Sequence, residues 1–286
     1  METENGSSAT LLITCPEKPG IISTVTNFLT EHIANIIDID QHTTDPRTGI
    51  FFMRIEFDVE SQTIQKLEQD LHELAKDYSM EWWLSTKEKR KRMAIFVSKA
   101  DHCLMELIWR WKTNEIPVDI PLVISNHADL KEVVESYGIP YYHIPLTKDT
   151  KENAEQKALE LLKGKVDFIV LARYMQILSP KFISNYHNKI INIHHSFLPA
   201  FVGANPYVRA YNRGVKLIGA TAHYVTNDLD EGPIIEQDVQ RINHQYTAED
   251  LKVAGRHVER RVLAQAVSWH VEDKVLVHGN KTIIFQ

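Results

Sequence analysis

The stretch Lys87-Glu88-Lys89-Arg90-Lys91-Arg92-Met93-Ala94-Ile95-Phe96-Val97 passes from a run of charged residues directly into a run of apolar residues. A short charged run between two patterned regions is typical of a solvated linker, although a basic run can also contact nucleic acid. The apolar run is typical of a strand buried on both faces of a sheet. The stretch therefore predicts a linker at 87–92, one domain over residues 1–86 and a second over 93–286.

Upstream of the linker, the patterns follow the order strand–helix–strand–strand–helix–strand. Pro19-Gly20 forms a turn between the first strand and the first helix, and 45–49 supplies a turn between the next two strands. This order predicts a small α+β domain of the ferredoxin-like type. The expected strands cover 11–15, 35–43, 50–59 and 81–84, and the expected helices cover 21–32 and 64–74.

Downstream of the linker, short apolar strands alternate with helical patterns, which predicts a doubly wound, mostly parallel α/β sheet of the Rossmann-like type. Sheets of this kind bind ligands beyond the carboxyl ends of their strands. The expected strands cover 93–97, 118–125, 141–144, 168–171, 190–194, 217–225 and 232–239, and the expected helices 102–112, 130–136, 154–162 and 248–269.

Composition limits the classes of function open to the chain. Its 286 residues carry a formal net charge of -6, so we expect no general attraction to nucleic acid or to an anionic membrane. The two cysteines, Cys15 and Cys103, predict free thiols in a reducing compartment rather than a disulfide framework. The polar N-terminus is unlike a signal peptide, and no apolar run approaches the ~20 residues of a membrane span. We therefore expect a soluble cytoplasmic protein.

Asn192 and His194 lie two positions apart in the expected strand 190–194. Residues i and i+2 of a strand share one face, so the amide and the imidazole should project together, whereas His195 should point to the other face. An amide N–H beside a protonated imidazole suits stabilisation of the oxyanion that forms when a carbonyl is attacked. A strand-end histidine with an ordinary structural hydrogen bond gives the same pattern, so the pair alone leaves both interpretations open.

An acidic loop precedes Gly232-Pro233. A carboxylate from this loop could meet His194 and favour its protonated form. Asp228, Asp230 and Glu231 are equal candidates on composition, and a solvated acidic turn is an equally good interpretation.

The sequence indicates neither a catalytic metal nor a side-chain nucleophile. The chain has 14 histidines, but His194 and His195 should diverge on a strand, and neither His-Glu-x-x-His nor a His-x-Glu with Cys-x-x-Cys occurs. Neither cysteine lies near these segments, and no Gly-x-Ser-x-Gly elbow is present.

Three segments, in the same order along the chain, resemble signatures of the formyltransferase family that uses 10-formyltetrahydrofolate. The resemblance covers about residues 93–286, and its segments are Val170-Leu171-Ala172-Arg173-Tyr174-Met175-Gln176-Ile177-Leu178, Asn192-Ile193-His194 with Ser196-Phe197-Leu198-Pro199 and Phe201-Val202-Gly203, and His223 through Ile235. The N-terminal domain is similar to an ACT domain in its element order and its Pro19-Gly20 turn. An ACT domain ahead of a formyltransferase domain resembles the arrangement of the formyltetrahydrofolate deformylase family.

The resemblance implies hydrolysis of 10-formyltetrahydrofolate to formate and tetrahydrofolate, without a permanently bound cofactor. It assigns catalysis to Asn192, His194 and Asp230: the amide donates to the tetrahedral oxyanion, the imidazole adds positive charge, and the carboxylate positions the water and relays its proton. The formate would supply purine synthesis, and the reaction would balance the one-carbon folate pools. Substrate contacts are implied for Arg173, Tyr174, Met175, Gln176, Leu178, His223 and Val225. The alternatives are a formyltransferase with an unidentified amine acceptor and a non-catalytic sensor of folate and amino acids.

Two positions depart from the family pattern. Glycinamide ribonucleotide formyltransferases carry a Gly-rich phosphate loop after the first strand. The corresponding stretch here, Val97-Ser98-Lys99-Ala100-Asp101-His102-Cys103-Leu104, has no glycine and adds the carboxylate of Asp101, which disfavours a phosphate and favours water as acceptor. Arg173 stands where related transferases often carry glycine, and is either a surface or interdomain residue or a contact to the acidic tail of the folate.

The ACT-like domain is expected to regulate the enzyme. Its Pro19-Gly20 turn allows close backbone approach by a small amino acid, so Pro19 and Gly20 are the candidate effector-binding residues. Such domains commonly pair, and we therefore expect a homo-oligomer; an oligomerisation module without an effector is the alternative.

Overall fold

The computed structural model describes residues 6–147, 149–199 and 206–286. The segment Phe201-Val202-Gly203 quoted above lies outside these ranges. By their internal contacts the residues form two units, which divide between Arg90 and Lys91, inside the charged run. The C-terminal segments Asp273–Leu276 and Ile283–Gln286 group with the first unit, an assignment that the sequence did not indicate.

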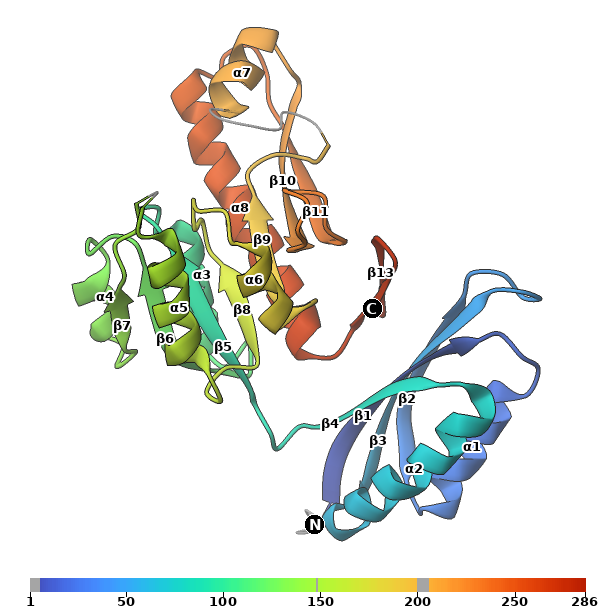
Figure 1. The fold of residues 1–286 in the computed structure, drawn as a ribbon. Coiled ribbons are helices and arrows are strands. Elements are labelled where there is room, and N and C mark those ends of the chain that lie inside the picture. The colour runs from blue at the N-terminus through green and yellow to red at the C-terminus, as the bar shows by residue number, and fades with distance from the viewer. Residues whose placement is uncertain (1–5, 148, 200–205) are drawn as a thin grey trace. The chain divides into compact units, whose positions relative to one another are not determined.

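The N-terminal unit is an antiparallel 4-stranded sheet in the order β2-β3-β1-β4. Helices α1 and α2 lie on one face of this sheet (Figure 1). This is the ferredoxin-like arrangement, and the prediction of this fold is confirmed. Its elements are β1 (Gly6–Pro16), α1 (Ile21–Glu31), β2 (Asn35–Thr43), β3 (Ile50–Glu60), the 3-10 helix η1 (Ser61–Thr63), α2 (Ile64–Tyr78) and β4 (Glu81–Thr86).

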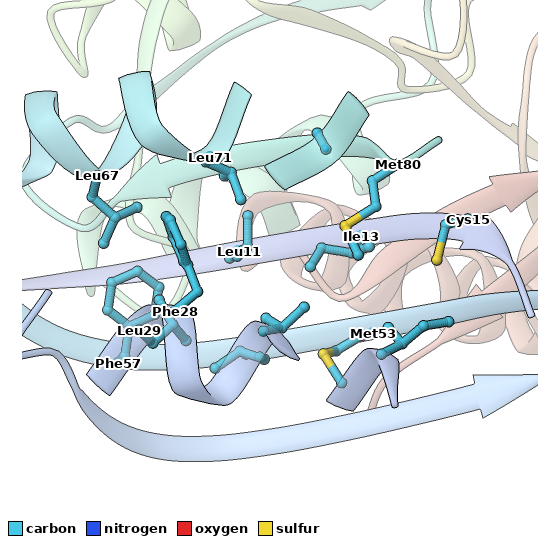
Figure 2. Close-up of a cluster of buried hydrophobic side chains, with 14 of the residues drawn as sticks. Leu11, Ile13, Cys15, Phe28, Leu29, Met53, Phe57, Leu67, Leu71 and Met80 are labelled. Atoms are coloured by element: carbon cyan, nitrogen blue, oxygen red, sulfur yellow. The ribbon is translucent and has the colours of Figure 1, made fainter. Parts of the chain in front are cut away.

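The core of this unit forms because alternate residues of each strand point toward the helices. Leu11 and Ile13 of β1 belong to one buried cluster with Leu29 of α1 and Leu71 of α2 (Figure 2). All four side chains are inaccessible to solvent. Full burial of a leucine or isoleucine side chain stabilises a fold by about 1.5–3 kcal/mol, so this cluster holds the helices on the sheet.

The other face of the same sheet carries residues from the end of the chain. Leu12 and Phe52 alternate with the helix-facing residues and form a second buried cluster with Phe285. Phe285 follows a hairpin made of β12 (Val275–His278) and β13 (Lys281–Ile284). The C-terminal segment therefore completes the packing of the N-terminal unit.

The second unit is built on a 7-stranded sheet in the order β11-β10-β9-β8-β5-β6-β7. The strands from β9 to β7 are parallel to one another, whereas β10 pairs antiparallel with both β9 and β11. The prediction of a mostly parallel, Rossmann-like sheet is confirmed. Its strands are β5 (Lys91–Val97), β6 (Val118–Ser125), β7 (Tyr141–His143), β8 (Phe168–Leu171), β9 (Ile190–His194), β10 (Leu217–Tyr224) and β11 (Ile234–Arg241).

The helices of this unit include one long element, α8, which packs against β10, β11 and α3. A capping box closes its first turn, since Thr247 and Asp250 each bond the other's backbone N–H. None of the described helices is long and apolar enough to cross a membrane. The helices are α3 (His102–Lys112), α4 (Lys131–Glu135), α5 (Lys151–Leu162), α6 (Pro180–Ile183), the 3-10 helix η2 (Ser184–Tyr186), α7 (Pro206–Arg213) and α8 (Ala248–Val271).

Candidate active site

Asn192 and His194 lie at the carboxyl end of β9, where the parallel strands β5, β8 and β9 end at one edge of the sheet. In the antiparallel ladder, Asn192 is opposite His223 of β10, and His194 is opposite Thr221. Because these positions share one face of the sheet, Asn192, His194 and His223 all line the same cavity. The expected side-by-side placement of Asn192 and His194 agrees with this geometry.

Asp230 reaches this face from the loop between β10 and β11. The loop turns back tightly at Gly232, where an added Cβ would lie 1.8 Å from the carbonyl oxygen of Tyr224, so only glycine fits. The turn brings Asp230 Oδ2 to 3.2 Å from His194 Nδ1 and Asp230 Oδ1 to 3.7 Å from His223 Nε2. The other acids of the loop, Asp228 and Glu231, are exposed.

His223 is fully buried and links the amide to the carboxylate. Its Nδ1–H donates to the carbonyl of Tyr224 at 2.9 Å, which directs Nε2 toward Asn192 Nδ2 at 3.2 Å. Sequence reasoning assigned His223 to the substrate; the structure shows that it also positions Asn192 and Asp230.

The electrostatics of the site centre on Asp230. Burial alone would raise the pKa of its carboxyl, but the neighbouring imidazoles of His194 and His223 outweigh burial and hold the pKa well below its usual range. Asp230 is therefore ionised at neutral pH and is a weak proton acceptor.

The cavity has a volume of about 640 Å³. It is lined by the whole segment 173–178, by Val225 and by the catalytic candidates, so every residue that the sequence assigned to the substrate borders one space. Ser98 fixes part of this wall, because its backbone N–H donates to the Arg173 carbonyl and its hydroxyl accepts from the Met175 N–H at 3.1 Å. Ser98 belongs to the glycine-free stretch after β5.

A buried polar cluster that the sequence did not predict lines the same cavity. Glu259 of α8 is 1% exposed, accepts from the hydroxyl of Tyr207 at 2.5 Å, and lies 2.7 Å from His102 Nε2. Arg173 Nε lies 3.5 Å from the same carboxylate. Burial would raise the pKa of Glu259, but His102, Arg173 and Tyr207 hold it below its usual value. The charged neighbours Arg260 and Arg261 gave no sign in the sequence that Glu259 is buried.

The structure contradicts the interpretation of Arg173 as a surface residue. Its side chain is only 15% exposed, so it is not a surface residue. Its φ of 63° lies in the left-handed region, where glycine costs least and arginine is strained. The contact to the folate's acidic tail stays a prediction.

His195 also differs from expectation. β9 ends at His194, so the alternation of strand faces does not extend to His195. Its ring stacks on that of His194, with centroids 5.2 Å apart, and lines the cavity. The prediction that the two histidines diverge was wrong.

One group of metal-type ligands occurs among the described residues. Donor atoms of His102, Cys103 and Glu259 lie within 4.8 Å of one another. Both carboxylate oxygens of Glu259 already contact His102 or Tyr207, and Arg173 brings positive charge to the carboxylate. Burial raises the pKa of the Cys103 thiol well above its usual value, which opposes the thiolate that a metal requires. This donor set does not suit a cation.

Comparison with known proteins agrees with the fold. Residues 91–267 match the formyl transferase family, and residues 9–75 match the ACT domain. The two matches define an ACT-domain-containing protein of the formyl transferase class. The chain is 57% identical over 284 residues to the formyltetrahydrofolate deformylase of Bacillus subtilis (strain 168), which covers 98% of this chain and 95% of that protein.

Solved structures lead to the same family. The crystal structure of a formyltetrahydrofolate deformylase from Pseudomonas syringae pv. tomato str. DC3000 has a TM-score of 0.94 and 44% identity, covering 100% of this chain and 96% of that chain. Glycinamide ribonucleotide transformylase 1 from Symbiobacterium toebii has a TM-score of 0.65 and 28% identity, covering 69% of this chain and 95% of that one. The chain belongs to the formyltetrahydrofolate deformylase family.

Proposed function

We propose that this protein hydrolyses 10-formyltetrahydrofolate to formate and tetrahydrofolate, with Asn192, His194 and Asp230 as catalytic residues. The observation that carries the proposal is the convergence of these three side chains on one cavity. The 57% identity to a formyltetrahydrofolate deformylase over nearly the whole chain supports the same reaction.

The formyl oxygen would be bound between the Asn192 amide and the imidazole of His194. Nε2 of His194 is buried and has no hydrogen-bond partner among the described residues, so it is available to the substrate. Asn192 has two N–H donors and spends at most one on His223, which leaves one for the oxyanion. Donors of this kind are worth about 2.7–4 kcal/mol of transition-state stabilisation.

Asp230 would keep His194 oriented, because its carboxylate holds Nδ1 and directs Nε2 into the cavity. Its low pKa makes it a poor base on its own. We therefore assign it orientation of the imidazole and the water, and relay of protons, rather than outright deprotonation. Protonation of N10 accompanies cleavage of the C–N bond and releases tetrahydrofolate.

The segment 173–178 would bind the pterin, together with His223 and Val225. Leu178 and Tyr174 are buried, and Met175 is exposed. This mixture suits a flat, mostly apolar ring system with a few polar edges. Arg173 and Gln176 are the polar members of the segment that we assign to the substrate.

An assay without added acceptor tests the reaction. Rapid release of formate from 10-formyltetrahydrofolate supports the hydrolase. Turnover that depends on an added amine would instead make the protein a transferase, and binding without turnover would make it a sensor.

Variants test the assignment of residues. Asn192→Ala and His194→Ala should each lower kcat by about 100-fold or more while folate binding is retained. Near-normal turnover in either variant would refute the assignment. His244→Gln, at an exposed position, is the matched control.

The ACT domain would bind a small amino acid at Pro19 and Gly20. Gly20 adopts a φ of 92° immediately before α1, a conformation that side chains disfavour, so the turn leaves open backbone for a ligand. Titration with glycine and with methionine should change rate or stability. No change would favour a role in pairing of subunits only.

The proposed setting is the cytoplasm. Cys15 and Cys103 are both buried free thiols, which suits a reducing compartment. Formate released there would supply purine synthesis.

A further inference from the structure

Part of the cavity wall has no role in the proposed mechanism. It is made by His102 of α3, Tyr207 of α7 and Glu259 of α8, which line the cavity together with the catalytic residues. Arg173, from the segment after β8, joins them through its ion pair with Glu259. These four residues, the buried polar cluster, come from four separate parts of the second unit. Their meeting at the cavity therefore calls for a function.

Two features give this wall a positive character. Helix α3 follows the carboxyl end of β5, and Ala100 and His102 at its start line the cavity. The N-terminus of a helix attracts anions, and the first turn of α3 holds no acidic residue. The second feature is the guanidinium of Arg173, whose Nε and Nη1 are buried without hydrogen-bond partners among the described residues. A wall of this kind favours an anion.

Glu259 supplies that anion from within the protein. Its Oε2 lies 2.7 Å from His102 Nε2 and 3.5 Å from Arg173 Nε. Its Oε1 accepts from the hydroxyl of Tyr207. The sequence assigned the carboxylate that opposes a phosphate to Asp101, but Asp101 is exposed. The buried negative charge beside this helix start is that of Glu259.

Two backbone features keep the partners of Glu259 in place at a cost in free energy. Arg173 has a φ of 63°, a conformation that is strained for a residue with a side chain. Tyr207 lies so close to α8 that a Cβ added at Gly255 would be 2.1 Å from its hydroxyl oxygen. Backbone strain of this kind gathers at functional sites. The position of the Glu259 carboxylate is therefore built into the fold.

The catalytic residues do not choose between water and an amine. Asn192 and His194 would stabilise the same tetrahedral oxyanion whether water or an amine attacks the formyl carbon. Another part of the cavity has to make that choice. Specificity against a competing ligand is commonly obtained by a repulsive element in the site, and a buried charge is such an element.

We propose that Glu259 is a specificity-determining residue, whose carboxylate occupies the place that the anionic group of an amine acceptor would need and so leaves water as the acceptor. This inference rests on the proposed hydrolysis. The wall attracts an anion through the start of α3 and Arg173, and Glu259 already satisfies that attraction. A second anion brought to the same place is repelled by the carboxylate.

Removal of the carboxylate should permit formyl transfer. In Glu259→Ala the lost side chain leaves space beside Arg173, and the carboxylate of a small amine such as β-alanine can take it. The amine nitrogen then bonds to the formyl carbon and the C–N10 bond breaks. The electron pair of that bond stays on N10, which takes the proton that the amine loses. The products are N-formyl-β-alanine and tetrahydrofolate.

The ratio of N-formyl-β-alanine to formate measures the choice of acceptor. Glu259→Ala should raise this ratio by about tenfold or more over wild type, the size of effect that single pocket contacts have on specificity. The neutral β-alaninamide should give a lower ratio with this variant. Glu132→Ala, at an exposed position of α4, is the matched control and should give the wild-type ratio. A ratio no higher in Glu259→Ala than in wild type, or equal ratios for the two amines, would overturn the proposal.

Binding of acetate tests the same place without folate. Acetate should raise the Tm of Glu259→Ala by about 3 °C or more relative to chloride at equal ionic strength, because it restores a carboxylate beside Arg173. Wild type should not respond, and Glu259→Ala with Arg173→Gln should respond less. If Glu259→Ala does not fold in chloride, recovery of folded protein in acetate is the supporting result. No effect of acetate on Glu259→Ala would overturn the proposal.

The two proposals can fail separately. If wild type releases no formate without an amine acceptor, the proposed hydrolysis fails, whereas the acetate measurement still reports whether Glu259 fills an anion's place. If wild type releases formate and Glu259→Ala does not formylate β-alanine, the hydrolysis stands and only the role of Glu259 is overturned.

Discussion

Replacement of Gly255 by alanine tests how closely α8 and α7 pack. An added Cβ would lie 2.1 Å from the hydroxyl oxygen of Tyr207, 2.3 Å from its Cζ and 2.5 Å from its Cε1. Carbon atoms in contact normally lie about 3.5–4.0 Å apart, so the ring must move by more than 1 Å. The hydrogen bond from Tyr207 to the buried Glu259, now 2.5 Å long, would then be broken.

The expected magnitude follows from opposing effects. Loss of a hydrogen bond to a charged group costs about 1.5–3 kcal/mol, and partial exposure of the tyrosine ring costs about 1–2 kcal/mol more. Alanine gains about 1 kcal/mol over glycine inside a helix. We therefore expect Gly255→Ala to lower the free energy of unfolding by about 1.5–4 kcal/mol.

Urea unfolding of single and double variants measures this effect. The decisive comparison is the same substitution in a Tyr207→Ala background, where the obstacle is absent. There Gly255→Ala should be neutral or stabilising, by up to about 1 kcal/mol. A Gly255→Ala variant as stable as wild type, or an equal loss in both backgrounds, would refute the reasoning.

Three further outcomes are expected. Burial lowers the pKa of His270 to about 3 from its ordinary 6.5, and nearby lysines add to the effect. The folded state therefore favours the neutral imidazole. Its effect on the free energy of unfolding is absent above the unfolded pKa, and as pH drops below it the free energy falls, by about 2 kcal/mol at pH 5. His270→Gln should therefore show a flatter dependence of unfolding free energy on pH in urea titrations, and parallel curves would contradict this. Phe285→Ala removes a buried ring from the N-terminal unit and should cost about 3–5 kcal/mol, seen as an earlier melting transition in calorimetry. Cys15 and Cys103 are buried with raised pKa values, so neither should react with a thiol reagent until urea unfolds the chain; rapid labelling in buffer would be the contrary result.

Much of the fold could be predicted because it is encoded locally. The apolar run at 11–15 predicted the first strand, and strand alternation predicted that Asn192 and His194 would share one face of theirs. The helices α6 and α7 were not predicted, since each is short. The C-terminal hairpin was missed for the same reason.

The candidate site was predicted less completely, because its remaining parts depend on where elements end and on distant partners. The strand was predicted to end at His194, as it does, but alternation was applied one residue beyond that end, which placed His195 on the wrong face. Glu259 resembles a solvated residue of a helix until its partners Tyr207 and His102 are known, and these lie 52 and 157 residues away in the sequence. Residue composition could not choose Asp230 over its acidic neighbours; a resemblance to known proteins was needed.

The cluster of Leu12, Phe52 and Phe285 has a consequence for synthesis of the protein on the ribosome. The residues that form the N-terminal sheet emerge first, and their helix-covered face can assemble at once from contacts that are close in sequence. The opposite face stays uncovered by Phe285 until nearly all of the second unit has been translated. We therefore expect the nascent N-terminal unit to expose Leu12 and Phe52 to chaperones for most of the time of translation, and to reach its full stability only once Phe285 has emerged.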